Sequence, residues 1–312
     1  MSLDQQADPT ASGLVIVDKA AGLTSHDVVA QVRRLAGTRK VGHAGTLDPM
    51  ATGVLVLGVN RATRLLGHLL LTDKAYDATL RLGSSTTTDD AEGEVIARAA
   101  TGEVTEERLL TELSGLVGEI EQVPSAVSAI KVDGRRAYER VRAGEPVELA
   151  ARRVRVDSIE VHGMRLGADG VDVQVSVRCS SGTYVRAIAR DLGARLGTRG
   201  HLTSLRRTAV GPFGLDVARP LEHLSDDLGL LPIAEGARLG FPSYELDEAE
   251  ATYVRFGRRL PVDLDTDGPV ALFAPDGEFL ALYEQVVSVD PLVDPSVDRA
   301  DDPWAKAVAV FV

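Results

Sequence analysis

The stretch that most constrains the fold runs from Val41 to Gly58 and reads VGHAGTLDPMATGVLVLG. Its glycines suit a backbone that turns tightly or lets a ligand approach closely. Asp48 precedes Pro49, which biases the aspartate away from the helical region. The stretch then enters an unbroken apolar segment, residues 54–57. We therefore expect a carboxylate on a loop that leads into a core strand, a common place for catalytic groups. On these residues alone, a turn-capping role for Asp48 is an equal alternative.

Length and composition narrow the class of protein. A chain of 312 residues can bury a large core, and we expect one large domain and a small one. It holds no run of about 20 apolar residues that would predict a membrane span. Residues 1–12 have no basic segment followed by an apolar one, so they predict a disordered tail rather than a signal peptide. The single cysteine, Cys179, excludes an internal disulfide and fits a reducing cytoplasm. No cysteine–histidine spacing typical of zinc occurs, so no metal is expected.

The charge is unevenly distributed along the chain. The net charge of −12 argues at first against a nucleic-acid partner. However, residues 245–312 hold 15 acidic and 5 basic side chains, whereas residues 1–244 hold 31 acidic and 29 basic ones. Arginines also cluster in residues 178–207. Residues 1–244 could therefore form a near-neutral domain with a basic face, followed by an acidic C-terminal segment. Arginines that are merely exposed to solvent explain the same pattern.

Periodicity predicts the elements around the central loop. Alternation predicts strands at 76–83 and 171–177, and an apolar face every three to four residues predicts helices at 25–36, 105–117 and 185–196. Thr24 or Ser25 can cap the first helix. From about residue 246, short apolar runs alternate with turn signals such as DTDG and APDG, which indicates a small β-barrel-like domain.

Arg186 stands out in the third helix because it falls in the first turn. The helix dipole disfavours a cation there by ~0.3–1 kcal/mol, and an acidic partner would offset that cost. Tyr76 begins its strand on the apolar side, and a tyrosine in that position is most often an ordinary core residue.

The segment GHAGTLDPMATGVL resembles the active-site motif of the TruB family of tRNA pseudouridine synthases, in which the aspartate is the catalytic nucleophile. Four further stretches resemble family motifs in the same order: DKAAGLTSHDVV, GSSTTTDDAEGEV, CSSGTYVRAIARDLG and HLTSLRRTAVGPF. The resemblance covers roughly residues 13–215. It implies an α+β fold whose mixed, largely antiparallel sheet is flanked by helices, with a PUA-like domain at the C-terminus.

The resemblance also implies an activity, the isomerisation of uridine 55 in the tRNA T loop to pseudouridine by base flipping. In this sequence Asp48 would be the nucleophile, Arg186 would pair with it and keep it ionised, and Tyr76 would stack on the base and take the proton from C5. Further substrate contacts would come from Lys19, His43, Asp90, Lys131, Tyr184 and Leu205. An isomerisation needs no cofactor.

The same resemblance divides the chain into a catalytic domain, residues 13–245, and a PUA-like domain, residues 246–312. Residues 123–149 match the insertion that binds the tRNA T arm. Within it, Asp133-Gly134 predicts a tight turn, and Arg135 to Arg142 could form a short basic helix. The expected partner is tRNA, with no membrane and no obligatory protein partner, and the expected protein is a cytoplasmic monomer.

Two other functions stay open on the sequence. A non-catalytic tRNA-binding or tRNA-folding protein on the same fold would tolerate loss of Asp48. A hydrolase of N-glycosidic bonds would need a second carboxylate to activate water, and Asp90 is the nearby candidate. The aromatic content of 4% argues against a single-strand binder built on stacking platforms.

Overall fold

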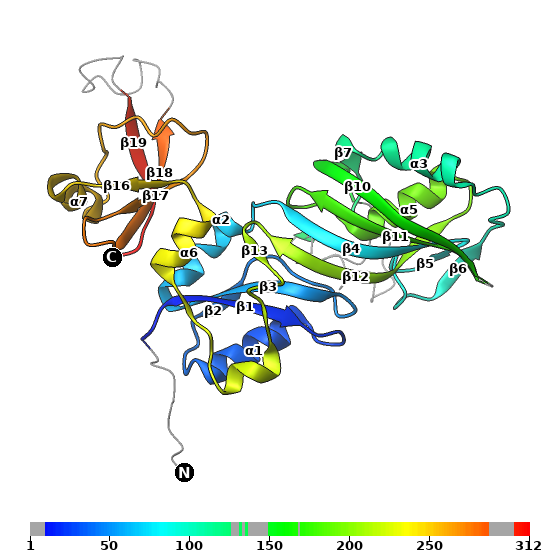
Figure 1. Cartoon of the computed structure of the whole chain (residues 1–312), viewed down its shortest axis with the longest axis horizontal. Helices are drawn as coiled ribbons and strands as arrows, with labels where there is room; N and C mark the ends of the chain where they lie inside the picture. The colour runs from blue at the N-terminus through cyan, green and yellow to red at the C-terminus, as the bar shows by residue number, and fades with distance from the viewer. Residues whose placement is uncertain (1–9, 126–130, 133–134, 137–148, 168, 287–302) are drawn as a thin grey trace, which may run out of the picture.

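The computed structural model describes residues 10–125, 131–132, 135–136, 149–167, 169–286 and 303–312. Within these residues a large, twisted sheet forms the body, helices pack on it, and a smaller second sheet lies at one end (Figure 1). The α+β prediction, with a mixed and largely antiparallel sheet and a separate C-terminal sheet, is confirmed. Most of the predicted N-terminal tail lies outside the described residues.

The large sheet has eleven strands, with the main path β14-β1-β3-β12-β4-β11-β10-β7. Among the strand pairs described for this sheet, only β1–β14 and β3–β12 are parallel. The strands β2, β13 and β15 attach to β3, β12 and β1. The bounds are β1 Gly13–Lys19, β2 Val41–His43, β3 Thr52–Val59, β4 Lys74–Leu82, β7 Gly118–Gln122, β10 Arg152–Gly167, β11 Gly170–Cys179, β12 Gly200–Val210, β13 Phe213–Gly214, β14 Arg219–Pro220 and β15 Leu231–Pro232.

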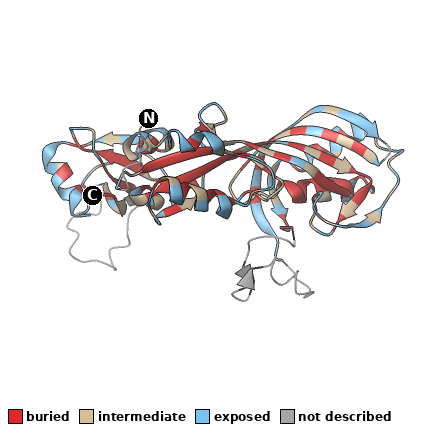
Figure 2. Ribbon diagram, turned by 90° about the horizontal axis from the view of Figure 1, so that it is seen from below, coloured by how far each residue is buried: buried red, intermediate tan, exposed pale blue. Residues whose placement is uncertain are grey.

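Three helices cover one face of this sheet: α1 Ser25–Leu35, α3 Glu106–Ser114 and α5 Val185–Arg195. Thr24 caps α1 as predicted, because its hydroxyl accepts from the Asp27 amide while the Asp27 carboxylate accepts from the Thr24 amide. The apolar stripes of the helices share one core with the inward-facing side chains of the strands. Figure 2 shows the buried residues concentrated in the strands and on the sheet-facing sides of the helices.

The C-terminal domain is a four-stranded sheet with the order β16-β17-β18-β19 and one helix, α7 Glu248–Arg255. The strands span β16 Ser243–Glu245, β17 Val270–Phe273, β18 Phe279–Val286 and β19 Trp304–Val310. Asp247 caps α7 in a capping box with Glu250. The first of these strands begins three residues before the predicted domain boundary at 246. The acidic, proline-spaced segment before Trp304 lies outside the described residues.

The two domains share an apolar core. The short helices α2 Leu66–Leu69 and α6 Ile233–Gly240 lie between them (Figure 1). The second core cluster joins Val54 and Val56 of β3 to Phe273, Phe279 and Phe311 of the C-terminal domain. Two arginines of the 3₁₀-helix η1 Asn60–Arg64 strengthen the junction: Arg61 donates to the Phe311 carbonyl at 2.9 Å and Arg64 to the Val310 carbonyl at 2.7 Å.

The remaining described elements are the hairpins β5 Ser84–Thr86 with β6 Val95–Arg98 and β8 Lys131–Val132 with β9 Arg135–Arg136, and the 3₁₀-helix η2 Leu221–Ser225. The predicted basic helix at Arg135–Arg142 is wrong at its start, because Arg135 and Arg136 pair as a strand with Lys131 and Val132. The Asp133-Gly134 turn signal favours that hairpin. The rest of the predicted helix lies outside the described residues.

We predict that Phe311→Ala destabilises the whole chain by about 3–5 kcal/mol, because the side chain is 2 % exposed and fills the shared core. Val312→Ala is the matched control: that side chain is exposed, and its loss should change the free energy of unfolding by less than about 0.5 kcal/mol. Urea unfolding should be followed by far-UV circular dichroism and by the fluorescence of Trp304, the single tryptophan. Separate transitions for the two signals would contradict a shared core.

Candidate active site

Asp48 lies on the loop between β2 and β3, and buried side chains from other elements hold both limbs of that loop. The Ser25 hydroxyl of α1 donates to the Leu47 carbonyl at 3.1 Å and accepts from the Leu47 amide at 2.9 Å. Lys19 Nζ donates to the Pro49 carbonyl at 3.2 Å, and to Ala20 and Leu23. Because the backbone on either side of Asp48 is anchored, the carboxylate is presented in one position.

Gly53 shows why the end of this loop requires glycine. Its φ is +98°, a conformation that L side chains rarely adopt. A Cβ atom there would lie 2.1 Å from the Arg207 carbonyl oxygen of β12, where β3 and β12 run side by side. The glycine at the end of the Asp48 loop is thus explained by a close approach of two strands.

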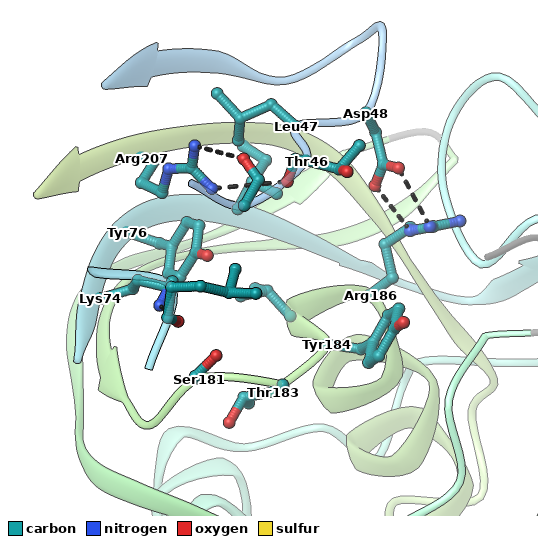
Figure 3. Close-up of a pocket in the computed structure, with 15 residues that line it drawn as sticks. Thr46, Leu47, Asp48, Lys74, Tyr76, Ser181, Thr183, Tyr184, Arg186 and Arg207 are labelled. Carbon is teal, nitrogen blue, oxygen red and sulfur yellow. Dashed lines mark hydrogen bonds and ion pairs between the residues drawn. The ribbon is translucent and has the colours of Figure 1, made fainter. Parts of the chain in front are cut away.

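Arg186 joins Asp48 to a second carboxylate. Its Nε lies 3.1 Å from Asp48 Oδ2, and its Nη2 donates to Asp48 Oδ1 at 3.3 Å (Figure 3). Nη1 lies 3.3 Å from Asp90 Oδ2 and donates to the Thr88 carbonyl at 2.9 Å. The Arg186 side chain is 5 % exposed. The two carboxylates offset the free-energy cost of burying this cation in the first turn of α5. The acidic partner that the sequence led us to expect for Arg186 is therefore present.

The electrostatic environment of Asp48 is a balance of opposing effects. Burial raises the pKa of the Asp48 carboxyl above its ordinary value, Arg186 opposes that shift, and Asp90 adds to it. The expected effect of Arg186 is present, but burial outweighs it. A carboxylate with weakened solvation is a stronger nucleophile than one in water, provided that the pH is high enough to ionise it.

A cavity of about 410 Å³ opens beside Asp48. Its walls come from the Asp48 loop, from β4 and β12, and from the segment leading into α5 (Figure 3). Tyr76, Tyr184 and Leu205 all line it. These three side chains lie far apart in the sequence, and the structure brings them together as the resemblance implied. The cavity is large enough for one flat heterocycle with its sugar.

Tyr76 is buried, and burial raises the pKa of its phenol above the ordinary value, while the Arg207 guanidinium opposes the shift. The phenol is therefore neutral at neutral pH. It can stack on a base in this state, but it can accept a proton only after losing its own. Tyr184 is the N-cap residue of α5, and the Gln122 side chain holds its backbone by accepting from the Tyr184 amide at 2.8 Å and donating to its carbonyl at 3.2 Å.

The other predicted substrate contacts are placed differently. Lys19 is fully buried beneath the loop, and burial lowers its pKa to about 8, so a supporting role fits it better than contact with a ligand. Asp90 is 4 % exposed and does not line the cavity. His43 stands at the end of β2, edge-on to His26, and burial lowers its pKa. Only the backbone of Lys131 is described, in β8.

Three residues of the site were missed by the sequence reading. Arg207 and Lys74 line the cavity as buried cations, and burial lowers the pKa of Lys74 to about 8. Gln122 is buried behind Tyr184. Arg207 and Lys74 occur within or beside the motifs that were recognised, but cross-strand position gives them their role. Gln122 ends β7, remote in sequence from the helix it supports.

Throughout the described ranges, no group of three or more His, Cys, Asp or Glu side chains is arranged to hold a metal ion. None of the helices in this part of the chain combines the length and the apolar character that a membrane crossing demands.

Comparison with family models gives three consecutive matches. Residues 33–185 match the TruB family pseudouridylate synthase N-terminal domain. Residues 186–231 match the tRNA pseudouridylate synthase B C-terminal domain, and residues 241–286 match the C-terminal model of tRNA pseudouridine synthase II. Together with the fold and the cavity, these matches place the chain in the class of pseudouridine synthases.

Similar proteins narrow the class to one family. The chain is 59% identical to tRNA pseudouridine synthase B of Arthrobacter sp. (strain FB24) over 281 residues, 87% of this chain and 92% of that protein. The corresponding protein of Thermobifida fusca (strain YX) is 57% identical over 278 residues, 88% of this chain and 94% of that protein. The chain belongs to the TruB family of pseudouridine synthases.

Solved structures agree with the fold. The crystal structure of a Cbf5-Nop10-Gar1 complex matches with a TM-score of 0.72 and 25% identity, covering 96% of this chain and 85% of that one. The archaeal box H/ACA sRNP Nop10-Cbf5 complex matches with a TM-score of 0.68 at 24% identity, covering 100% and 93%, and supports the fold alone.

We predict that Arg186→Met moves the acid limb of activity to higher pH. With ionised Asp48 as the expected reactive group, activity falls as the pH drops through its pKa. Without the cation that pKa rises further. The variant should also be less stable by about 3–5 kcal/mol, because two carboxylates lose their buried partner. The pH dependence of the single-turnover rate checks the first effect.

Arg190→Met is the matched control for this experiment. Arg190 lies one turn along α5 and pairs with Asp89 and Asp191 instead of Asp48. Its loss should leave the acid limb in place. An unchanged or lowered acid limb in Arg186→Met would contradict the pairing of Arg186 with the reactive carboxylate.

Proposed function

We propose that this protein converts uridine 55 in the T loop of tRNA to pseudouridine, with Asp48 as the nucleophile. The observation that carries the proposal is a single aspartate at the mouth of a base-sized cavity, held by a buried arginine and faced by a tyrosine. Relatives at 56–59% identity are tRNA pseudouridine synthases B, which supports the substrate class. The T arm as the recognised part of the tRNA rests on the resemblance of residues 123–149.

The reaction exchanges one bond of the nucleoside for another. The bond from C1′ to N1 breaks, the uracil rotates, and a bond from C1′ to C5 forms. The hydrogen on C5 leaves as a proton and N1 gains one, so the net composition is unchanged. Attack by Asp48 on C6 of the base or on C1′ of the sugar gives a covalent intermediate, which divides one difficult step into two easier ones.

The residues around the cavity have distinct parts in this scheme. The uridine must be flipped out of the folded loop at a cost of a few kcal/mol. His43, at the end of β2, would occupy the space that the base leaves. Tyr76, Tyr184 and Leu205 would enclose the flipped base. Tyr76 would give its own phenolic proton to N1 of the detached uracil and then receive the proton from C5, so that the two transfers balance.

The alternative of an N-glycosidic hydrolase is disfavoured by the position of Asp90. That carboxylate is buried, pairs with Arg186, and accepts from the Thr88 hydroxyl and the Glu92 amide at 3.1 Å. It does not line the cavity, so it is not placed to activate a water molecule there. A non-catalytic tRNA-binding protein would have no need for the buried ion pair that holds Asp48.

We predict that Asp48→Asn abolishes pseudouridine formation and leaves the dissociation constant for tRNA within about tenfold, ~1.4 kcal/mol. The amide keeps the shape of the carboxylate but is a far weaker nucleophile. Unmodified tRNA should be incubated with each protein, and pseudouridine mapped by nucleotide. Asp77→Asn is the control, because Asp77 neighbours Tyr76 on β4 but faces Ser176 on the exposed side. Turnover by Asp48→Asn at a tenth of the normal rate would contradict the assignment.

We further propose that the C-terminal domain contributes to the choice of RNA. Its net charge is −10, which repels a phosphate backbone unless local contacts overcome the repulsion. Arg258 and Arg259 are exposed and lie 5.5 Å from the Phe256 ring centre and 4.1 Å from the Trp304 ring centre. Such arginines and rings suit contacts with phosphates and bases away from the T loop.

We predict that the double variant Arg258→Ala/Arg259→Ala weakens binding to whole tRNA and reduces its salt slope by about one to two, with no change for an isolated T-arm hairpin. Point variants are preferable to removal of residues 246–312, because deletion would expose the core shared by the two domains. Arg255→Ala is the control, since Arg255 pairs with Glu278 at 2.7 Å. Equal weakening for tRNA and hairpin would contradict a contact outside the T arm.

A further inference from the structure

Arg207 is a buried cation in the cavity wall for which the scheme above has no use. It lies on β12, directly opposite Tyr76 of β4 in the strand register, and its side chain is 1 % exposed. The next residue back, Arg206, faces the other side of the sheet, where it pairs with Asp18 at 2.6 Å. Two successive arginines of one strand therefore have opposite environments, and only Arg207 lines the cavity.

The Arg207 guanidinium spans both limbs of the Asp48 loop. Nε donates to the Val54 carbonyl at 2.7 Å, Nη2 to the Gly45 carbonyl at 3.1 Å and Nη1 to the Thr46 carbonyl at 3.4 Å. Figure 3 shows the two bonds to the Gly45 and Thr46 carbonyls, with Tyr76 below the guanidinium in this view. One rigid group thus connects β12, the strand paired with that of Tyr76, with the residues on either side of Asp48.

The charge of Arg207 has no direct neutralising partner. All three of these hydrogen bonds go to carbonyl oxygens, and across the described chain no carboxylate forms an ion pair with this side chain. Burial of an unpaired cation is costly, and a loop could be anchored by neutral donors at lower cost. A positive charge kept in the wall of the cavity is therefore available to the groups that become anionic there.

We propose that Arg207 is a positioning residue of the active site: it sets the spacing between Asp48 and Tyr76, and its charge stabilises anionic forms of both. This inference rests on the proposed function and extends it to a residue outside the Asp48–Tyr76–Arg186 set. The two effects of Arg207 can be separated by substitution. Positioning of Asp48 requires the forked guanidinium that donates to three carbonyl oxygens, whereas stabilisation of anions requires only a positive charge.

The electrostatic consequence has a definite sign. The Arg207 cation lowers the pKa of the Tyr76 phenol against the effect of burial, and it also lowers that of Asp48. Removal of the charge therefore raises both values. The acid limb of activity, which reports ionisation of Asp48, then moves to higher pH, and so does any alkaline limb that reports Tyr76.

The experiment compares single-turnover pseudouridine formation, its pH dependence and the dissociation constant for tRNA in Arg207→Gln, Arg207→Lys and the control Arg206→Gln. We expect Arg207→Gln to lose roughly a hundredfold in rate, with tRNA binding within about threefold and both limbs at higher pH. Arg207→Lys keeps the charge without the fork, so its rate should fall about tenfold with the limbs unmoved. Arg206→Gln should retain the rate and pH profile of the unaltered protein.

Several results would overturn the inference. If Arg207→Gln loses rate with a pH profile that superimposes on that of the unaltered protein, Arg207 is only structural. If Arg207→Gln does not fold, Arg207→Lys decides, because an undiminished rate in that variant shows that the fork is dispensable. Failure of the unaltered protein to form pseudouridine would contradict the proposed function itself, a result distinguishable from these.

Discussion

The architecture around the cavity depends on the burial of Arg186. A guanidinium that is 5 % exposed is tolerated only with strong partners, and its partners come from two separate loops. Asp48 belongs to the loop between β2 and β3, while Asp90 and the Thr88 carbonyl belong to the turn after β5. The cation thereby fixes α5 against both loops. The buried ion pair gives the Asp48 carboxylate a defined position, while burial of Asp48 itself raises its pKa against the effect of Arg186.

A second constraint is the sharing of one apolar core by the catalytic and C-terminal domains. Val54 and Val56 begin directly after the Asp48 loop, and their outer faces pack in the same cluster as Phe273, Phe279 and Phe311. The C-terminal sheet is therefore part of the support for the strand that anchors the loop. This arrangement gives the acidic domain a structural role besides any contact with RNA.

The structure also separates residues that the family motifs had grouped together. Lys19, Asp48 and Asp90 all match family motifs, but only Asp48 lines the cavity. Lys19 and Asp90 are buried behind it, where they bind the Pro49 carbonyl and Arg186. The motif matches therefore lie close together around the Asp48 loop. The degree of burial then distinguishes the residue that faces the cavity from the residues that hold the loop.

The sequence by itself determined the local elements and indicated a candidate for the reactive group. Periodicity located the helices of Val28 and Ile188, Thr24 signalled a cap, and the glycine-rich motif singled out Asp48. Only the tertiary structure decided the roles of Arg207, Lys74 and Gln122, and the joining of the two cores. The hydrogen-bond partners of Arg207 and Gln122 are 60 or more residues away, and such contacts depend on sheet register and on the burial of charge. Neither sheet register nor the burial of charge leaves a periodic signal in the chain, because periodicity reports which face of an element is apolar but not what that face contacts.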